Sequence, residues 1–163
     1  MNDGIKVRVL FVCMGNICRS PSAEAVFHKL LADHGLEGRI EADSAGTHAY
    51  HIGKPPDPRS QAAGRERGVE MGHLRARQVE RSDFDYFDHI LAMDQWNLDI
   101  LLAEAPAGQR AKVRLLVEFA ENHTADEVPD PYYGGDRGFE HVLDLIEDSA
   151  TGLLKHLRQA HRL

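Results

Sequence analysis

Cysteine is scarce in this chain: only Cys13 and Cys18 occur among its 163 residues. Secreted domains that disulfides hold together use many more cysteines, so a reducing, cytoplasmic compartment is the favoured location. Long apolar runs are missing too, and no segment approaches the roughly 20 apolar residues that a membrane-spanning helix needs. The first residues lack the basic stretch that opens a secretory signal. From these absences we expect a cytoplasmic protein without a membrane span.

Positive charge is also in short supply. The chain has 19 Lys and Arg residues against 26 Asp and Glu residues, which gives a formal net charge of −7. This balance argues against broad binding to nucleic acids or anionic membranes, although one arginine can still hold an anion at close range. The sequence has no internal repeat, no low-complexity segment and no linker rich in Gly and Ser. We therefore expect a single domain over residues 1–163 and no nucleic-acid partner.

Segments of strand type alternate with segments of helix type along the chain. The strand-like segments are residues 6–13, 39–43, 86–93 and 112–116, and the helix-like segments are residues 22–34, 58–68, 95–102 and 138–163. This alternation predicts βαβ units and a parallel sheet that is covered on both faces. The expected fold is α/β: a doubly wound sheet of about four parallel strands with helices on both faces.

The most informative stretch is residues 9–22, which read VLFVCMGNICRSPS. An apolar strand ends in Cys13, Arg19 follows, and a helix begins at once. The positive end of that helix and the guanidinium group both favour the reactive thiolate form of the cysteine. Gly15 and Asn16 permit backbone conformations that turn N–H groups inward, and Arg19 offers a planar fork of donors. The spacing is typical of a phosphate-binding loop with a nucleophile at its base.

Residues 12–21 match the pattern V-C-x-G-N-x-C-R-S-P at every specified position, and the chain thereby resembles the low-molecular-weight protein tyrosine phosphatases. Further segments fall in family order at family-like spacing: residues 43–46, 56–59, 73–78, 87–94 and 130–134. The resemblance covers roughly residues 7–160, far more than a lone motif. It implies a phosphoric monoester hydrolase that needs no metal or other cofactor. Such an enzyme cleaves phosphotyrosine in proteins or small aryl phosphates through a cysteinyl-phosphate intermediate and releases inorganic phosphate.

The resemblance also implies roles for the reacting groups. Cys13 is the expected nucleophile, Arg19 the cation that binds phosphate, and Asp130 the general acid. The Ser20 hydroxyl group would donate to the cysteine sulfur and ease its departure in the second step. Cys18 would form a reversible disulfide with the nucleophile and protect it from over-oxidation. By residue type alone, Cys18 is a small side chain packed under the loop, and Asp130 belongs to a routine Asp-Pro turn.

Other residues are implied to shape the site around these groups. The expected phosphate loop and its supports are Met14, Gly15, Asn16, Ile17, Cys18, Ser20, Ser44 and His73. Within this set, Ser44 and His73 would hydrogen-bond the loop from behind, although His73 by itself is an ordinary core or surface histidine. The expected substrate cleft is lined by Tyr50, Tyr132 and Tyr133, since aromatic walls favour an aryl phosphate over an alkyl one.

Several polar residues are weaker candidates for a functional site. His48 and His51 have a spacing that some metal sites use, but no cysteine or acidic ligand set accompanies them, so no metal site is expected. Glu24 and residues 65–67 are interpreted as solvated helix faces. If Asp130 is not the acid, Asp43 and Asp94 are the next candidates.

Three other functions suit the same loop. A thioredoxin-linked arsenate reductase needs two further cysteines downstream, and none follows Cys18. Related protein-arginine phosphatases carry a threonine in place of Ile17, so this apolar residue, together with Tyr50, favours an aryl phosphate. A non-catalytic phosphate-binding module would be expected to have lost the cysteine or the acid, and Cys13 and Asp130 are both present.

Overall fold

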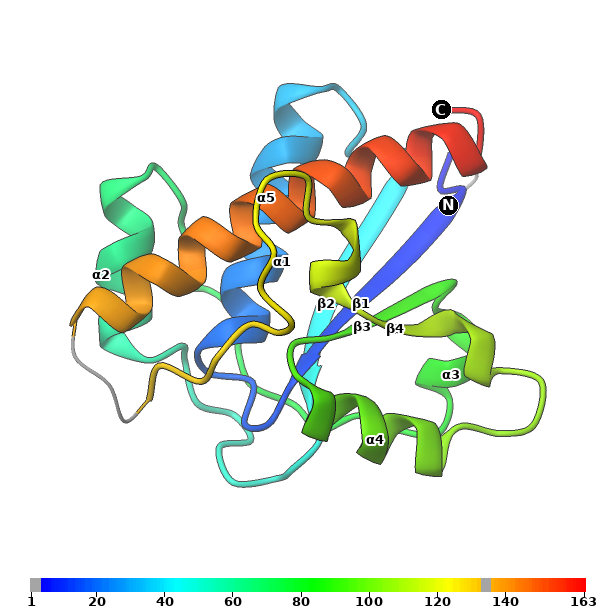
Figure 1. Ribbon diagram of the computed structural model, residues 1–163, viewed down its shortest axis with the longest axis horizontal. Coiled ribbons are helices and arrows are strands. Elements are labelled where there is room, and N and C mark those ends of the chain that lie inside the picture. The colour runs from blue at the N-terminus through cyan, green and yellow to red at the C-terminus, as the bar shows by residue number, and fades with distance from the viewer. Residues whose placement is uncertain (1–3, 133–135) are drawn as a thin grey trace.

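The computed structural model describes residues 4–132 and 136–163, and Figure 1 shows the path of the chain. The strands and α-helices follow one another as β1 Val7–Cys13, α1 Arg19–Asp33, β2 Ile40–Gly46, α2 Pro58–Glu66, α3 Asp83–Tyr86, β3 His89–Ala92, α4 Gln95–Glu104, β4 Val113–Leu115 and α5 Asp136–Ala160. Two short 3-10 helices flank β4: η1 Arg110–Lys112 and η2 Leu116–Phe119. Strands and helices alternate as the sequence predicts, and α3, η1 and η2 are additions to that prediction.

The four strands form one parallel sheet in the order β2-β1-β3-β4. β1 pairs with β2 along its whole length, from Val7 opposite Ile40 to Cys13 opposite Gly46. Since β2 lies on one side of β1 and β3 on the other, the strand order reverses beside β1. Open parallel sheets bind ligands outside the carboxyl ends of the strands at such a reversal. Cys13 is the last residue of β1 and lies at this point.

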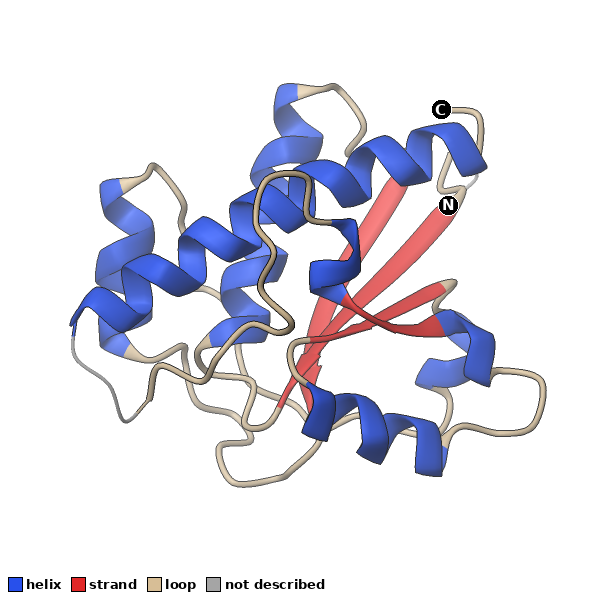
Figure 2. Ribbon diagram, viewed as in Figure 1, coloured by secondary structure: helices blue, strands red, loops and turns tan. Residues whose placement is uncertain are grey.

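Burial on both sides explains why β1 is apolar almost without interruption. Val9 and Phe11 belong to a core cluster that is shared with α1 and α5. Leu10 and Val12, the alternate residues, belong to a second cluster that is shared with α3 and α4. In the view of Figure 2 the strands lie between α5 above and α4 below. The predicted doubly wound α/β fold, with helices on both faces of four parallel strands, is confirmed.

β2 and β3 differ most from the segments that the sequence predicts. β2 extends to Gly46 and does not end at residue 43, because it pairs with β1 as far as Cys13. Its polar Ser44 is buried, which an alternating strand pattern does not reveal. β3 begins only at His89, because residues 83–86 form α3 instead of the start of a strand.

Arg67, just after α2, joins that helix to α5. Its guanidinium group lies 2.6 Å from Glu140, 2.9 Å from Asp144 and also against Glu147, three carboxylates on successive turns of α5. The interpretation of residues 65–67 as a merely solvated face is therefore wrong for Arg67, because its partners come from a helix far away in the sequence.

Candidate active site

The loop between β1 and α1 wraps around a space at the end of the sheet. Its residue Asn16 has a φ of 58°, in the left-handed region that asparagine tolerates better than most residues. The segment that follows β2 braces the loop, since Thr47 N donates to Cys13 O over 2.9 Å. Gly46 permits this close approach, because a Cβ atom there would lie 2.7 Å from the carbonyl oxygen of Met14.

The sulfur of Cys13 lies against the first turn of α1. The Ser20 hydroxyl oxygen is 3.0 Å from Sγ, and Ser20 N donates to Sγ over 3.4 Å. Cys13 is only 3% exposed. A backbone N–H at a helix N-terminus and a hydroxyl group therefore both point at the sulfur. The hydroxyl group is in place to donate to the sulfur when a leaving thiolate forms there.

Asn16 connects this serine to a second one. Its Nδ2 donates to Ser20 Oγ over 2.8 Å and to Ser44 Oγ over 3.0 Å, while its Oδ1 accepts from Arg77 N over 3.0 Å. Both amide hydrogens and the amide oxygen are used, so the side chain has one orientation. Because Asn16 supplies a hydrogen to Ser20 Oγ, the serine's own hydroxyl hydrogen is left for an acceptor, and Cys13 Sγ at 3.0 Å is nearer than Ala45 O at 3.4 Å.

Glu24 ends this chain of hydrogen bonds. Ser44 Oγ donates to Glu24 Oε1 over 2.7 Å, and the glutamate is 5% exposed. Burial raises the pKa of Glu24 to about 7, against the opposing effect of the Ser44 hydrogen bond; Asp43 raises it further. The expectation of a solvated Glu24 is wrong, because this residue lies on the side of α1 that faces β2 and the loop.

Arg19 is held by acceptors from two other loops. Its Nη1 donates to Asp94 Oδ2 over 2.5 Å and to Val128 O over 3.1 Å, and its Nη2 lies 3.8 Å from Asp130 Oδ2. The residue is 2% exposed. Burial alone would lower the pKa of Arg19, but Cys13 and the two carboxylates outweigh burial and raise it. A buried cation that keeps its charge is thereby fixed beside the sulfur.

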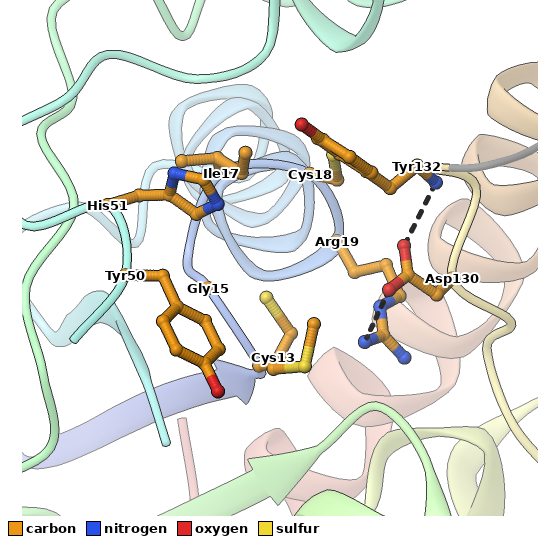
Figure 3. Close-up of a pocket in the computed structure, with 10 residues that line it drawn as sticks. Cys13, Gly15, Ile17, Cys18, Arg19, Tyr50, His51, Asp130 and Tyr132 are labelled. Carbon is orange, nitrogen blue, oxygen red and sulfur yellow. Dashed lines mark hydrogen bonds and ion pairs between the residues drawn. The ribbon is translucent and has the colours of Figure 1, made fainter. Parts of the chain in front are cut away.

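These groups line one cleft of about 250 Å³. Its lining residues are Cys13, Met14, Gly15, Ile17, Cys18, Arg19, Tyr50, His51, Asp130 and Tyr132. Figure 3 shows Asp130 beside Arg19 at this cleft. Asp130 Oδ1 accepts from Tyr132 N over 2.9 Å, which leaves Oδ2 on the side of Arg19. The cleft therefore combines a thiol, a buried cation and a carboxyl group, the set that phosphoryl transfer through a cysteine needs.

The family model described as low molecular weight phosphotyrosine protein phosphatase matches residues 8–163. The chain belongs to this family. YfkJ of Bacillus subtilis, a low molecular weight protein-tyrosine-phosphatase, is 43% identical over 157 residues, which are 96% of this chain and 99% of that protein. A crystal structure of a protein tyrosine phosphatase from Entamoeba histolytica has a TM-score of 0.93 and 42% identity, and the match covers 97% of this chain and all of that one (100%). A Drosophila arginine phosphatase matches with a TM-score of 0.84 and 32% identity over 92% of this chain and 97% of that one.

By family, then, this chain is a protein-tyrosine-phosphatase and a hydrolase. The structure brings most of the predicted site residues of this phosphatase together at one cleft, and Asn16, Ser20 and Ser44 lie directly behind it. Tyr133 lies outside the described residues. Cys13 and Cys18 are both free thiols. Burial, and secondarily Asp57, raises the pKa of Cys18 to about 12.

His73 is the predicted residue that the structure places elsewhere. It is exposed and, among the residues that the structure describes, it makes no hydrogen bond to the loop. The backbone N–H of Arg77 holds Asn16 instead. The prediction of a supporting role for His73 is therefore wrong, and a backbone group that carries no residue-type signal takes that role.

Three further residues lie at this phosphatase site in roles that the sequence did not predict. Asp94 carries two functions at once, because its Oδ1 caps α4 at Asn97 N while its Oδ2 binds Arg19. The cap is a contact three residues along the chain, whereas Arg19 lies 75 residues away in the sequence. His51 lines the cleft, and Val128 contributes only its carbonyl oxygen, which no sequence pattern reports.

Within residues 4–132 and 136–163, no three His, Cys, Asp or Glu side chains gather as a metal site. No helix there combines the length and the apolar character that crossing a bilayer requires.

Proposed function

We propose that this chain hydrolyses phosphotyrosine in peptides, or small aryl phosphates, with Cys13 as the nucleophile. The observation that carries this proposal is the contact of Cys13 Sγ with Ser20 at a cleft that Arg19 and Asp130 also line. A tetrahedral anion in that cleft would meet the loop amides and the guanidinium group together. The two free thiols, one of them reacting, support a reducing compartment such as the cytoplasm.

The first step transfers the phosphoryl group to the enzyme. The thiolate of Cys13 attacks phosphorus in line, so that an S–P bond forms while the P–O bond to the phenol breaks. Arg19 and the loop amides stabilise the charge on the three equatorial oxygens. Asp130, in its acid form, gives its proton to the departing phenolate oxygen.

The second step releases inorganic phosphate. A water molecule attacks phosphorus, and the carboxylate that Asp130 has become takes its proton. The S–P bond breaks and the electron pair returns to sulfur, where the Ser20 hydroxyl group is 3.0 Å away and stabilises the thiolate. The enzyme thereby returns to its starting state, with the thiolate of Cys13 free and the proton back on Asp130.

The walls of the cleft support an aryl substrate. Ile17, Tyr50 and Tyr132 line it and offer apolar or aromatic surface to a phenyl ring. Arginine phosphorylation is the second candidate, because a Drosophila arginine phosphatase shares the fold at 32% identity. Ile17 argues against it in this chain, since related arginine-specific enzymes carry threonine there.

Kinetics on phosphotyrosine, phosphoarginine and arsenate, compared side by side with the wild type and with Cys13→Ser, test this proposal. We expect turnover of phosphotyrosine above the other two, and its loss in Cys13→Ser. Removing a covalent nucleophile costs several orders of magnitude, so retention of more than about a tenth of kcat would refute the assignment. Thermal stabilisation of the variant by inorganic phosphate shows whether its anion site has survived.

A further inference from the structure

Aromatic rings continue outward from Tyr50, at the cleft wall, to two residues that the proposed reaction does not use. Tyr50 lines the cleft, the ring of His48 stacks on it with centroids 5.1 Å apart, and the indole of Trp96 lies 5.4 Å from His48. We name Tyr50, His48 and Trp96 the aromatic row. Tyr50 is 68% and Trp96 is 56% exposed. His48 between them is half-buried. Single exposed aromatic residues are common, but a row of contacting rings with exposed ends that starts at a substrate cleft is typical of a binding surface.

The charge beside the outer end of this row is negative. α4, which carries Trp96, has no Lys or Arg, and its acidic residues are Asp99 and Glu104. Glu127, from the segment that also carries Asp130, reaches the start of α4, where its Oε2 accepts from Gln95 N over 3.0 Å. Trp96 therefore directly follows Gln95, whose N–H binds the carboxylate of Glu127, and it lies one helical turn before Asp99.

The basic residues around α4 lie away from its start, where Trp96 is. Arg110 donates to Leu102 O near the other end of the helix, and Arg81 lies there too, in a pocket with Glu104. Lys112 Nζ donates to Phe84 O over 2.8 Å, and Arg114 pairs with Glu118. From residue 115 to residue 132 the chain contains acidic residues but no Lys or Arg. Glu127 and Asp99 accept hydrogen bonds from Gln95 and, within the described residues, neither pairs with a Lys or Arg. Two carboxylates without a cationic partner therefore lie next to an exposed aromatic face.

We propose that the aromatic row, with Glu127 and Asp99, binds a basic side chain that flanks the phosphotyrosine of a peptide substrate. This inference rests on the proposed function, because Tyr50 connects the row to the phosphate site. A guanidinium or ammonium group is attracted by the face of an indole more than by other rings, and carboxylates at its edge add to that attraction. An acidic flanking residue at the same place is repelled.

Peptide kinetics test the charge preference. Phosphotyrosine peptides that differ only in one flanking residue, Arg, Ala or Glu, are compared by kcat/KM, with that residue on the N-terminal side in one series and on the C-terminal side in another. We expect the Arg peptide of one series to exceed its Glu counterpart by about three- to tenfold at low salt. Trp96→Ala should reduce that ratio toward one, and Trp96→Phe should restore most of it.

Tyr86→Ala is the matched control. This residue is also an exposed aromatic, but it lies at the end of α3 beside Arg8 and Glu41, away from the cleft lining. It should leave the Arg-to-Glu ratio unchanged. Equal kcat/KM for the three peptides in both series, or an unchanged ratio in Trp96→Ala, would overturn the proposal. If no peptide is hydrolysed at all, the proposed function has failed, and binding decides the inference separately.

Binding is directly visible because Trp96 is the single tryptophan of the chain. Tryptophan-free phosphopeptides are titrated into Cys13→Ser, which prevents turnover, and the indole fluorescence is recorded. We expect a saturable change with the Arg peptide at a lower concentration than with the Glu peptide. Inorganic phosphate alone should leave the signal nearly constant. Identical titration curves for the Arg and Glu peptides would refute a basic subsite whatever the catalytic result.

Discussion

The hydroxyl group of Ser44 donates a 2.7 Å hydrogen bond to the buried carboxyl group of Glu24. Through Asn16 and Ser20, this contact continues to the sulfur of Cys13. A titratable group that is removed from solvent is thus connected to the nucleophile by side chains alone. The ionisation of Glu24 should change the free energy of unfolding with pH, and unfolding can be measured independently of the chemistry at the cleft.

Glu24→Gln should change the pH dependence of stability in a defined direction. Because folding raises the pKa of this carboxyl group from 4.5 to about 7, the folded protein holds a proton that the unfolded chain releases. Stability from this group is full below about pH 4.5 and is lost as the pH rises to about 7, by up to about 3 kcal/mol. Relative to the wild type, Glu24→Gln should therefore gain stability between pH 5 and pH 8.

Urea unfolding at both pH values measures this difference, and taking it between variant and wild type cancels the other titrating groups. Glu37→Gln, at an exposed glutamate, is the control and should show no such gain. A Glu24→Gln difference that is the same at the two pH values would contradict the buried, neutral carboxyl group.

Asp94→Asn should leave a buried cation short of one negative partner. Asparagine can still cap α4 at Asn97 N, but the charge that faces Arg19 Nη1 is gone. We expect a loss of about 1–3 kcal/mol, since Val128 O and Asp130 remain near the guanidinium group. Inorganic phosphate, which supplies negative charge at the same place, should raise the Tm of this variant more than that of the wild type. Asp99→Asn, one turn further along α4, is the control. If phosphate raises the Tm of Asp94→Asn, Asp99→Asn and the wild type equally, Asp94 does not neutralise the charge of Arg19.

Asp130→Asn should slow poor leaving groups more than good ones. The variant keeps an oxygen that can accept from Tyr132 N, so the turn retains its shape while the acid is lost. The phenolate of phosphotyrosine needs the proton, whereas p-nitrophenolate needs it less. The single-turnover rate should fall on both substrates, and the loss should be larger for phosphotyrosine than for p-nitrophenyl phosphate by a factor of about ten or more. Equal losses on both substrates would mean that Asp130 only shapes the loop.

Cys18 should resist alkylation while Cys13 reacts. Burial raises the pKa of Cys18 to about 12, so at neutral pH it is a thiol and not the nucleophilic thiolate. Peptide mapping after brief treatment with iodoacetamide should find the label on Cys13, and inorganic phosphate should protect that residue. The unfolded protein should be labelled at both positions. Preferential labelling of Cys18 in the folded protein would show that its burial is incomplete.

His89 should weaken the fold in acid. Burial, and then the nearby His161, lowers the pKa of His89 to about 4, so the unfolded chain binds a proton that the folded protein refuses. Stability is lost as the pH falls from about 6.5 to about 4, by about 1–2 kcal/mol after allowance for partial exposure. His89→Asn should lose less stability over this range than the wild type, as thermal unfolding at pH 7 and pH 5 would show. His34→Asn, at an exposed histidine at the end of α1, is the control, and it should lose as much stability over this range as the wild type.

The groups that lie close together along the chain could be predicted from the sequence. Cys13, Ser20 and Arg19 are separated by a few residues, so a strand, a tight loop and a helix start suffice to bring them to one point. The alternation of strand-like and helix-like segments predicted a sheet that is covered on both faces. The caps of α2 and α4 are local contacts of the same kind, because Asp57 accepts from Arg59 N and Asp94 from Asn97 N.

The tertiary structure decided what surrounds those groups. Asp94 and Val128 lie 75 and 109 residues from Arg19 in the sequence, and Ser44 lies 20 residues from Glu24. A helical pattern does not say which polar residue another strand will cover, so the prediction of a solvated Glu24 was wrong. The supporting role of His73 was implied by the family resemblance, whereas the structure leaves this histidine exposed. Residue type and periodicity determine local conformation. Partners across the fold depend on how the helices pack on the sheet, and that packing creates the burial that shifts the pKa of Glu24 and holds Arg19 in place.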